Sequence, residues 1–214
     1  LVRCPRARHD LTLLCVRQAN DNPPSWVASS TTIYNEILRR QPDALTRLYE
    51  GFEWDRMDEH GDDETATSGY KVPFFSNANG VISCRYNRSW INKVNIRRNS
   101  PMSESDSALL DLIDDIAVET RLEFPFHAGD IQFANNYTTL HGRAAHESQP
   151  DEAEKRVLQR IWLNVPAFRD YADESIIRYG IGTHGKIGWT ADDLRNGRHN
   201  TPRARRADGA VALD

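Results

Sequence analysis

Residues 156–165 interleave apolar and polar side chains in a pattern that predicts a β-strand, in which successive side chains point to opposite faces. One face of this strand carries Arg156, Leu158, Arg160 and Trp162. If that face is buried, each guanidinium needs an anionic partner to offset the cost of its desolvation. Four residues along a strand span roughly 13 Å, so the two arginines need not share one partner.

The segment before this strand predicts two further strands, the second of which ends at a histidine. Residues 130–133 form a short strand that enters a turn at Asn135-Asn136, and residues 137–140 are rich in strand-forming side chains. His141 then stands at a strand end. A histidine at one strand end, followed by an inward arginine on the next strand, suits a metal that binds together with a carboxylate co-substrate.

The other predicted elements are short. Apolar runs and a turn at 77–80 indicate strands, and Ser, Thr or Asp residues before periodic apolar segments indicate helix starts. The strands are expected at 11–17, 71–75 and 81–86, and the helices begin near 29–32, 43 and 103–105. Many short strands with a few helices predict a mainly β protein with flanking helices (α+β), built on a double-stranded β-helix or jelly roll.

Length and composition add a few limits. The 214 residues suit one domain, expected at 1–194, with a polar, disordered tail at 195–214. The net charge of -4 gives no reason to expect nucleic acid or an anionic membrane as a partner, and no apolar run reaches the roughly 18 residues of a membrane span. Cys4, Cys15 and Cys84 are odd in number and lack metal-site spacing, so a reducing, cytoplasmic location is expected.

Two runs in the second half of the chain resemble a known family. GDIQFANNYTTLHGR, followed after a loop by RVLQRIWL, is similar to the C-terminal half of the taurine dioxygenase/TfdA family of Fe(II)- and 2-oxoglutarate-dependent oxygenases. The similarity continues upstream through LLCVRQA, VASSTTIYNEILRRQPDALTRLYEGFEWDR and ISCRYNRSWI, and so covers most of the chain. This resemblance implies a clavaminate synthase-like jelly roll with Fe(II) and 2-oxoglutarate as cofactors.

The resemblance also implies roles for single residues. His141 matches the distal iron ligand, and Arg156 matches the arginine that grips the distal carboxylate of 2-oxoglutarate. Ser25 stands where the family often places a hydroxyl that helps to hold 2-oxoglutarate. Arg160 matches a position that contacts an anionic substrate in some members, which makes it a candidate substrate residue. Arg143 could orient the turn at His141 or face the active site, and a structural role is favoured.

Each of these residues also has a purely structural interpretation. Asp130 or Glu152 could neutralise Arg156, because buried arginines often pair with local acids. Trp162 could wall a substrate pocket, although a core position is the simpler interpretation.

The first two metal ligands do not appear in the form that the resemblance requires, which is a His-x-Asp motif just before the first strand. There His9 and Asp10 are adjacent. Adjacent strand residues point to opposite faces, so both can bind one metal only if a bulge or turn intervenes. A literal His-x-Asp occurs at His60-Gly61-Asp62, in an acidic loop. Three alternatives stay open: the pair at 9–10, the pair at 60–62, or a motif absent from this chain.

The leading interpretation is an Fe(II)- and 2-oxoglutarate-dependent dioxygenase that uses O2 to hydroxylate or oxidatively cleave a small organic substrate, with anionic compounds as candidates. The alternative is a catalytically inactive family member, retained as a binding or scaffold protein because the proximal His-x-Asp motif is missing. The chain begins at Leu1 rather than Met, so the N-terminal part of the domain is expected to be incomplete. The substrate is not set by the sequence, and assembly into a homo-oligomer stays open.

Overall fold

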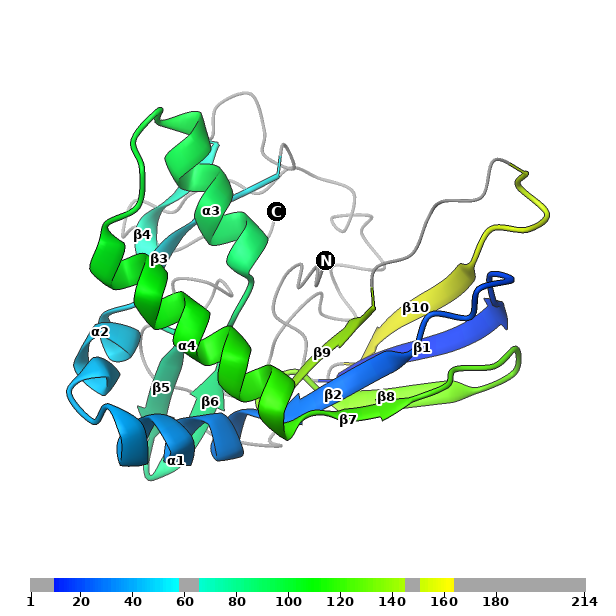
Figure 1. Ribbon diagram of the computed structural model, residues 1–214, viewed down its shortest axis with the longest axis horizontal. Helices are drawn as coiled ribbons and strands as arrows, with labels where there is room; N and C mark the ends of the chain where they lie inside the picture. Colours follow the sequence, from blue (N-terminus) through cyan, green and yellow to red (C-terminus); the bar gives the residue numbers. More distant parts are fainter. Residues whose placement is uncertain (1–9, 58–65, 145–150, 164–214) are drawn as a thin grey trace, which may run out of the picture.

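Two three-stranded antiparallel sheets and a group of helices form the framework of the protein (Figure 1). This computed structural model describes residues 10–57, 66–144 and 151–163. The strands are β1 (Asp10–Arg17), β2 (Ser25–Ser29), β3 (Phe52–Asp55), β4 (Thr67–Val72), β5 (Phe75–Ala78), β6 (Val81–Cys84), β7 (Leu122–Phe124), β8 (Ile131–Asn135), β9 (Thr139–Arg143) and β10 (Val157–Leu163). The helices are α1 (Ser30–Arg40), α2 (Ala44–Glu50), α3 (Arg88–Arg97) and α4 (Glu104–Thr120).

The order of the strands follows the pattern of a double-stranded β-helix. The first sheet has the order β10-β1-β8, and the second sheet has the order β7-β2-β9. From β7 onward the chain changes sheet at every strand. The helices and the two-stranded ribbons β3-β4 and β5-β6 are inserted between β2 and β7. This arrangement agrees with the fold class predicted from the sequence.

Apolar side chains on the inner face of the first sheet form a small core between the two sheets. Leu11, Leu13 and Cys15 alternate along β1 and are buried, with Phe126 and Leu158 packed against them. Full burial of such a side chain contributes roughly 1.5–3 kcal/mol relative to leaving it in water. The strand predicted at 11–17 is therefore confirmed, and Leu158 packs inward as its alternation predicted.

The outer face of the first sheet exposes large apolar side chains. Phe133 of β8 is 69% exposed and Ile161 of β10 is 48% exposed, on either side of Thr12 in β1. The other exposed members of this face are Val16, Ile131, Val157 and Leu163. The strand predicted at 156–165 is confirmed over Val157–Leu163, and it begins one residue later than predicted, while residues 164 and 165 lie outside the described part of the chain.

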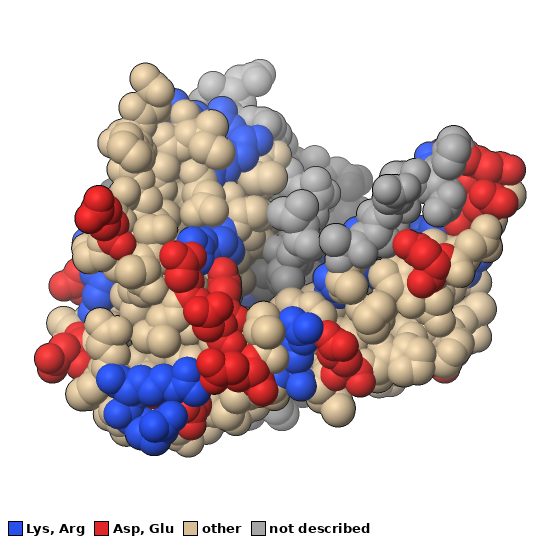
Figure 2. Space-filling view, viewed as in Figure 1, with Lys and Arg blue, Asp and Glu red and all other residues tan. Residues whose placement is uncertain are grey.

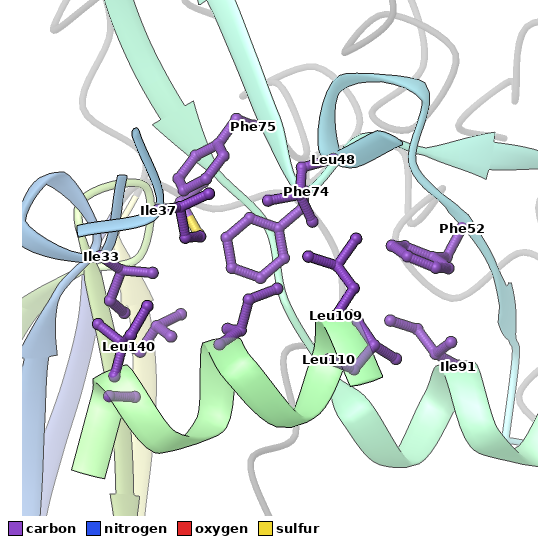
Figure 3. Close-up of a cluster of buried hydrophobic side chains, with 14 of the residues drawn as sticks. Ile33, Ile37, Leu48, Phe52, Phe74, Phe75, Ile91, Leu109, Leu110 and Leu140 are labelled. Atoms are coloured by element: carbon purple, nitrogen blue, oxygen red, sulfur yellow. The ribbon is translucent and has the colours of Figure 1, made fainter. Parts of the chain in front are cut away.

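The helices pack their apolar sides into a second core, beside the sheets (Figures 1 and 3). Ile33 and Ile37 of α1 are fully buried there, as are Leu48 of α2 and Leu110 of α4. Phe74 lies among them, edge to face with the neighbouring aromatic ring of β5. Ala28 and Leu140 of the second sheet belong to the same core, so the helices cover that sheet from outside.

Two of these helices begin at serine N-caps that lie where the sequence predicted helix starts. The Ser29 hydroxyl accepts a hydrogen bond from the Thr32 amide at 3.3 Å at the start of α1, and the Ser103 hydroxyl accepts one from the Asp106 amide at 3.1 Å at the start of α4. At Gly51, α2 ends with a φ of +78°.

The prediction of one continuous strand at 71–75 is wrong in its extent. Strand β4 ends at Val72 and β5 begins at Phe75, because Pro73 lacks the amide hydrogen that would continue the ladder. The hairpin that follows is confirmed: Asn79 and Gly80 have positive φ angles of 51° and 83°, as its tight turn requires.

Helix α3 was not predicted from the sequence. Its first turn is capped by the Asn87 side chain, which accepts a hydrogen bond from the Trp90 amide at 3.2 Å. Acidic side chains of α4 form a red band on the surface next to the blue arginines of α1 in Figure 2. Arg40 joins the two helices through an ion pair with Glu119 at 2.5 Å. Among the described helices, none has the length and apolar character to cross a membrane.

Candidate active site

The inner face of the second sheet gathers polar side chains from two neighbouring strands. In the register of β2 and β9, Ser25 lies opposite Arg143 and Val27 lies opposite His141. Directly opposed residues share a face of an antiparallel sheet, and so do residues two apart on one strand. Ser25, His141 and Arg143 are therefore on the same side of the second sheet, the side that looks toward the first sheet.

Arg156 connects the first sheet to this group. Its Nη2 donates a hydrogen bond to the Ser25 hydroxyl at 3.2 Å, although the two residues are 131 positions apart. Ser25 is only 4% exposed, and Arg156 stands one residue before β10. The structure thus brings together the two residues for which the sequence predicts cofactor binding, and that role itself stays a prediction.

The Arg156 guanidinium retains unused hydrogen-bonding capacity. Its Nε is buried and has no hydrogen-bond partner among the described residues. Burial, and then the nearby charge of Arg143, lower the pKa of the Arg156 guanidinium, while the Cys15 thiol and Asp21 act in the opposite direction. A partly buried guanidinium with an orphaned donor is a site prepared for an anion.

The local acids that could have neutralised Arg156 are engaged elsewhere. The Glu152 carboxylate pairs with Lys155, and the Asp130 carboxylate accepts from the His127 amide at 2.7 Å. Within the described part of the chain Arg156 forms no ion pair with a carboxylate. Neither of the two acids that the sequence offered for a purely structural role therefore pairs with Arg156 in the region that the structure describes.

Arg143 is a further cation at this site. It lies directly opposite Ser25 in the sheet, and its charge is close enough to lower the pKa of Arg156. Its Nη1 donates to the Ala144 carbonyl at 3.0 Å, and the side chain is exposed. The sequence carried a signal only for the face on which Arg143 lies, because Arg143 stands two residues after His141 and so shares its face of a strand.

His141 is buried on the same face and is 9% exposed. It is the third residue of β9, so the prediction that it stands at a strand end is wrong. Desolvation by burial, and then the positive charge of Arg160, lower the pKa of His141 to about 4. The imidazole is consequently neutral near pH 7, which is the form that binds a metal.

The remaining candidate ligands lie largely outside the described part of the chain. Asp10 begins β1, and its backbone is opposite Leu163 and Asn135, but its side chain is not described. Residues 1–9 and 58–65, which hold His9 and the His-x-Asp motif at 60–62, lie outside as well. Among the side chains that the structure describes, no three of His, Cys, Asp or Glu come together as a metal site.

Arg160, the candidate substrate residue, sits near His141. In the register of β1 and β10 it lies opposite the buried Leu13, which places it on the inner face of the first sheet. The residue is nevertheless exposed, and its charge acts on the imidazole of His141. A cation that reaches both solvent and the histidine is well placed to meet an anionic group entering from outside. The side chain of Trp162 is not described.

Strand β9, which carries His141, is tightly packed on its outer face at Gly142. Trp26 lies opposite Gly142 on the outer face of the second sheet. A Cβ atom added to Gly142 would overlap Cζ2 and Cε2 of the Trp26 ring. Only a glycine therefore allows the indole to lie flat on the strand beside His141.

Comparison with known proteins decides the family. Residues 5–162 match the family described as "Taurine catabolism dioxygenase TauD, TfdA family". The chain belongs to this family. The match spans the first sheet, the second sheet and the inserted helices, which confirms the resemblance drawn from the sequence.

Two curated relatives are similar to this member of the TauD/TfdA family. FR-33289 synthase of Streptomyces rubellomurinus (strain ATCC 31215) is 29% identical over 180 residues, which cover 81% of this chain and 52% of that protein. Taurine hydroxylase-like protein SAT17 of Stachybotrys chartarum (strain CBS 109288 / IBT 7711) is 28% identical over 157 residues, which cover 72% of this chain and 39% of that protein. The chain thus spans about half the length, or less, of these relatives.

Solved structures share the fold. Asparagine oxygenase in complex with Fe(II), 2S,3S-3-hydroxyasparagine and succinate has a TM-score of 0.54 at 15% identity, covering 75% of this chain and 46% of that one. The non-heme iron oxygenase OrfP in complex with Fe and alpha-ketoglutaric acid has a TM-score of 0.51 at 18% identity, with the same coverage. The predicted fold of this TauD/TfdA member is therefore confirmed.

Proposed function

We propose that this chain forms part of a non-haem iron, 2-oxoglutarate-dependent dioxygenase and holds the distal carboxylate of 2-oxoglutarate between Arg156 and Ser25. The observation that carries the proposal is the partly buried Arg156 guanidinium, which already bonds Ser25 yet keeps a buried Nε without a partner among the described residues. A guanidinium presents its donors as a planar fork that matches the two oxygens of a carboxylate.

The surrounding groups suit a doubly charged ligand. Arg143 adds a second positive charge near Arg156, and the Asp21 carboxylate offsets the two cations only in part. The Ser25 hydroxyl can donate to a carboxylate oxygen while it accepts from Arg156, because a hydroxyl has one donor and two lone pairs. This group of side chains therefore favours an anion such as a carboxylate over a neutral ligand.

His141 is the residue that we assign to the metal. Its imidazole is neutral, buried and on the same face of the second sheet as Ser25. The other ligands would come from His9 and Asp10, from the motif at 60–62, or from residues outside this chain. When bound, Fe(II) with 2-oxoglutarate and O2 supplies oxidative decarboxylation to succinate and CO2, coupled to oxidation of a substrate carbon.

The chain's own residues position these partners. Arg156 and Ser25 fix one end of 2-oxoglutarate, and this orients the keto acid end toward the His141 side of the sandwich. Arg160 would attract an anionic group of the substrate, since its charge already reaches His141. We therefore propose a small organic substrate, with anionic compounds as the first class to test. The cytoplasmic location and a homo-oligomer stay predictions.

A second candidate is a non-catalytic binding protein of the same fold. It is favoured by one feature of the sequence: no His-x-Asp motif stands just before β1, where His9 and Asp10 are adjacent instead. Such a protein would still bind 2-oxoglutarate at Arg156 but would not respond to iron.

Anaerobic titration of the chain with Fe(II) and 2-oxoglutarate separates the two candidates. A dioxygenase site is expected to give a metal-to-ligand charge-transfer absorption band and, after O2 is admitted, release of succinate. Arg156→Ala should abolish both signals, whereas Arg39→Ala, a change in an exposed arginine of α1, should leave them intact. Binding of 2-oxoglutarate without the band would favour the non-catalytic protein, and no binding at all would contradict both.

A further inference from the structure

We propose that a cavity behind the second sheet binds a small, uncharged aromatic molecule. The cavity has a volume of about 320 Å³ and lies between the outer face of the second sheet and helices α3 and α4. Leu140 and Trp26 line it, and these residues alternate along their strands with His141 and Val27. The cavity is therefore on the opposite side of the sheet from the Ser25 and Arg156 site.

The size and the walls of the cavity favour an aromatic ligand. Apolar atoms make up most of its surface, and the indole of Trp26 and the side chains of Ala117 and Leu140 contribute to them. A cavity of roughly 150 Å³ holds one benzene ring, so the larger volume here has room for two fused rings. Apolar walls favour such a ligand because its burial removes apolar surface from water.

The arginine at this cavity is already engaged by two carboxylates. Arg88 donates from Nη1 to Asp114 at 3.0 Å and from Nη2 to Asp111 at 2.7 Å. The Tyr86 hydroxyl donates to Asp114 at 2.6 Å. An anionic ligand would lose its hydration without gaining a free cation, so an uncharged molecule is preferred over an anion.

One polar group at the cavity is free to orient a ligand. The amide of Asn92 lines the cavity and has no hydrogen-bond partner among the residues that the structure describes. The amide of Asn95, one helical turn further along α3, is instead occupied by the Ile91 carbonyl at 3.2 Å and does not line the cavity. A hydroxyl on the ligand would therefore bond Asn92, and Asn95 offers a matched control.

Calorimetric titration of the metal-free chain with 2-naphthol tests this site. We expect saturable binding of one molecule per chain, unchanged by added 2-oxoglutarate, because the two sites lie on opposite faces of the sheet. Asn92→Ala should weaken binding by roughly three- to tenfold, the effect of one neutral hydrogen bond, and Asn95→Ala should leave it unchanged. Naphthalene-2-sulfonate, which adds a charge, should bind more weakly than 2-naphthol.

A cavity-filling variant gives the sharpest result. Ala117 lines the cavity from α4 and is 6% exposed, so Ala117→Leu should place its larger side chain in the space and abolish binding while the variant stays folded. Absence of saturable binding by the unmodified chain would overturn the proposal. It would also be overturned by unchanged binding in a folded Ala117→Leu variant or, if that variant does not fold, by equal affinity in Asn92→Ala and Asn95→Ala. None of these results depends on iron or on 2-oxoglutarate binding.

Discussion

Arg156 donates a hydrogen bond to the Ser25 hydroxyl at 3.2 Å and so links the two sheets beside His141. The bond leaves the buried Nε of Arg156 unpaired among the described residues, which is costly unless an anion completes the site. The contact therefore combines a structural tie between the sheets with a binding position.

Replacing Ser25 by alanine tests the hydroxyl. Ser25→Ala should weaken 2-oxoglutarate binding by about three- to tenfold, because one neutral donor to the carboxylate is lost while the Arg156 charge remains. Calorimetric titration measures the dissociation constant, and Ser76→Ala, a change in a similarly buried serine of β5, is the control. Equal affinities for Ser25→Ala and the unmodified chain would show that the hydroxyl does not contact the ligand.

Arg143 should act through its charge. Because its side chain is exposed, we expect Arg143→Ala to weaken 2-oxoglutarate binding by only about two- to fivefold at low salt. The difference should shrink as salt is raised toward about 1 M, where the screening length falls to roughly 3 Å. A salt-independent loss of affinity would indicate a direct hydrogen bond rather than a field effect.

Gly142 should tolerate no side chain. The added methyl group of Gly142→Ala would overlap the Trp26 ring, so we expect a loss of about 1–3 kcal/mol in the free energy of unfolding, measured by urea denaturation. The double variant with Trp26→Leu should recover part of the loss that Gly142→Ala causes, because the smaller side chain can move aside. Strictly additive effects of the two changes would contradict the packing of Trp26 on this strand.

Two glycines with similar positive φ angles differ in how closely other atoms approach them. Gly51 and Gly80 have φ of +78° and +83°, but a Cβ on Gly51 would overlap the Val72 carbonyl, whereas a Cβ on Gly80 would meet nothing within 4 Å. Gly80→Ala should therefore cost about 1 kcal/mol, the penalty of a left-handed alanine, and Gly51→Ala clearly more. Equal losses in thermal unfolding would refute the close approach at Gly51.

Much of the framework could be predicted because it depends on local patterns. The alternation in β1 and β10, the serine caps of α1 and α4 and the Asn79-Gly80 turn are each set by a few neighbouring residues. The resemblance to the TauD/TfdA family then selected Ser25 and Arg156, which no periodicity relates to one another.

Features that depend on tertiary contacts could not be predicted. Helix α3 was not predicted, because Trp90, Ile91 and Val94 form only a narrow apolar stripe among polar and charged residues. The placement of Arg143 opposite Ser25 requires the register of β2 and β9, and strands that are far apart in sequence carry no local signal of their register. The cavity beside Trp26 likewise exists only once the helices cover the sheet.

The most direct test of the proposed function is the affinity of the chain for 2-oxoglutarate with and without the Arg156 guanidinium. Anaerobic calorimetry in the presence of Fe(II) should show binding by the unmodified chain and a loss of about 100-fold in Arg156→Ala, since removing a bidentate charged partner costs roughly 2–5 kcal/mol. Arg39→Ala, which alters an exposed ion pair of α1, should bind like the unmodified chain. Equal binding by Arg156→Ala and the unmodified chain would contradict the assignment of this site.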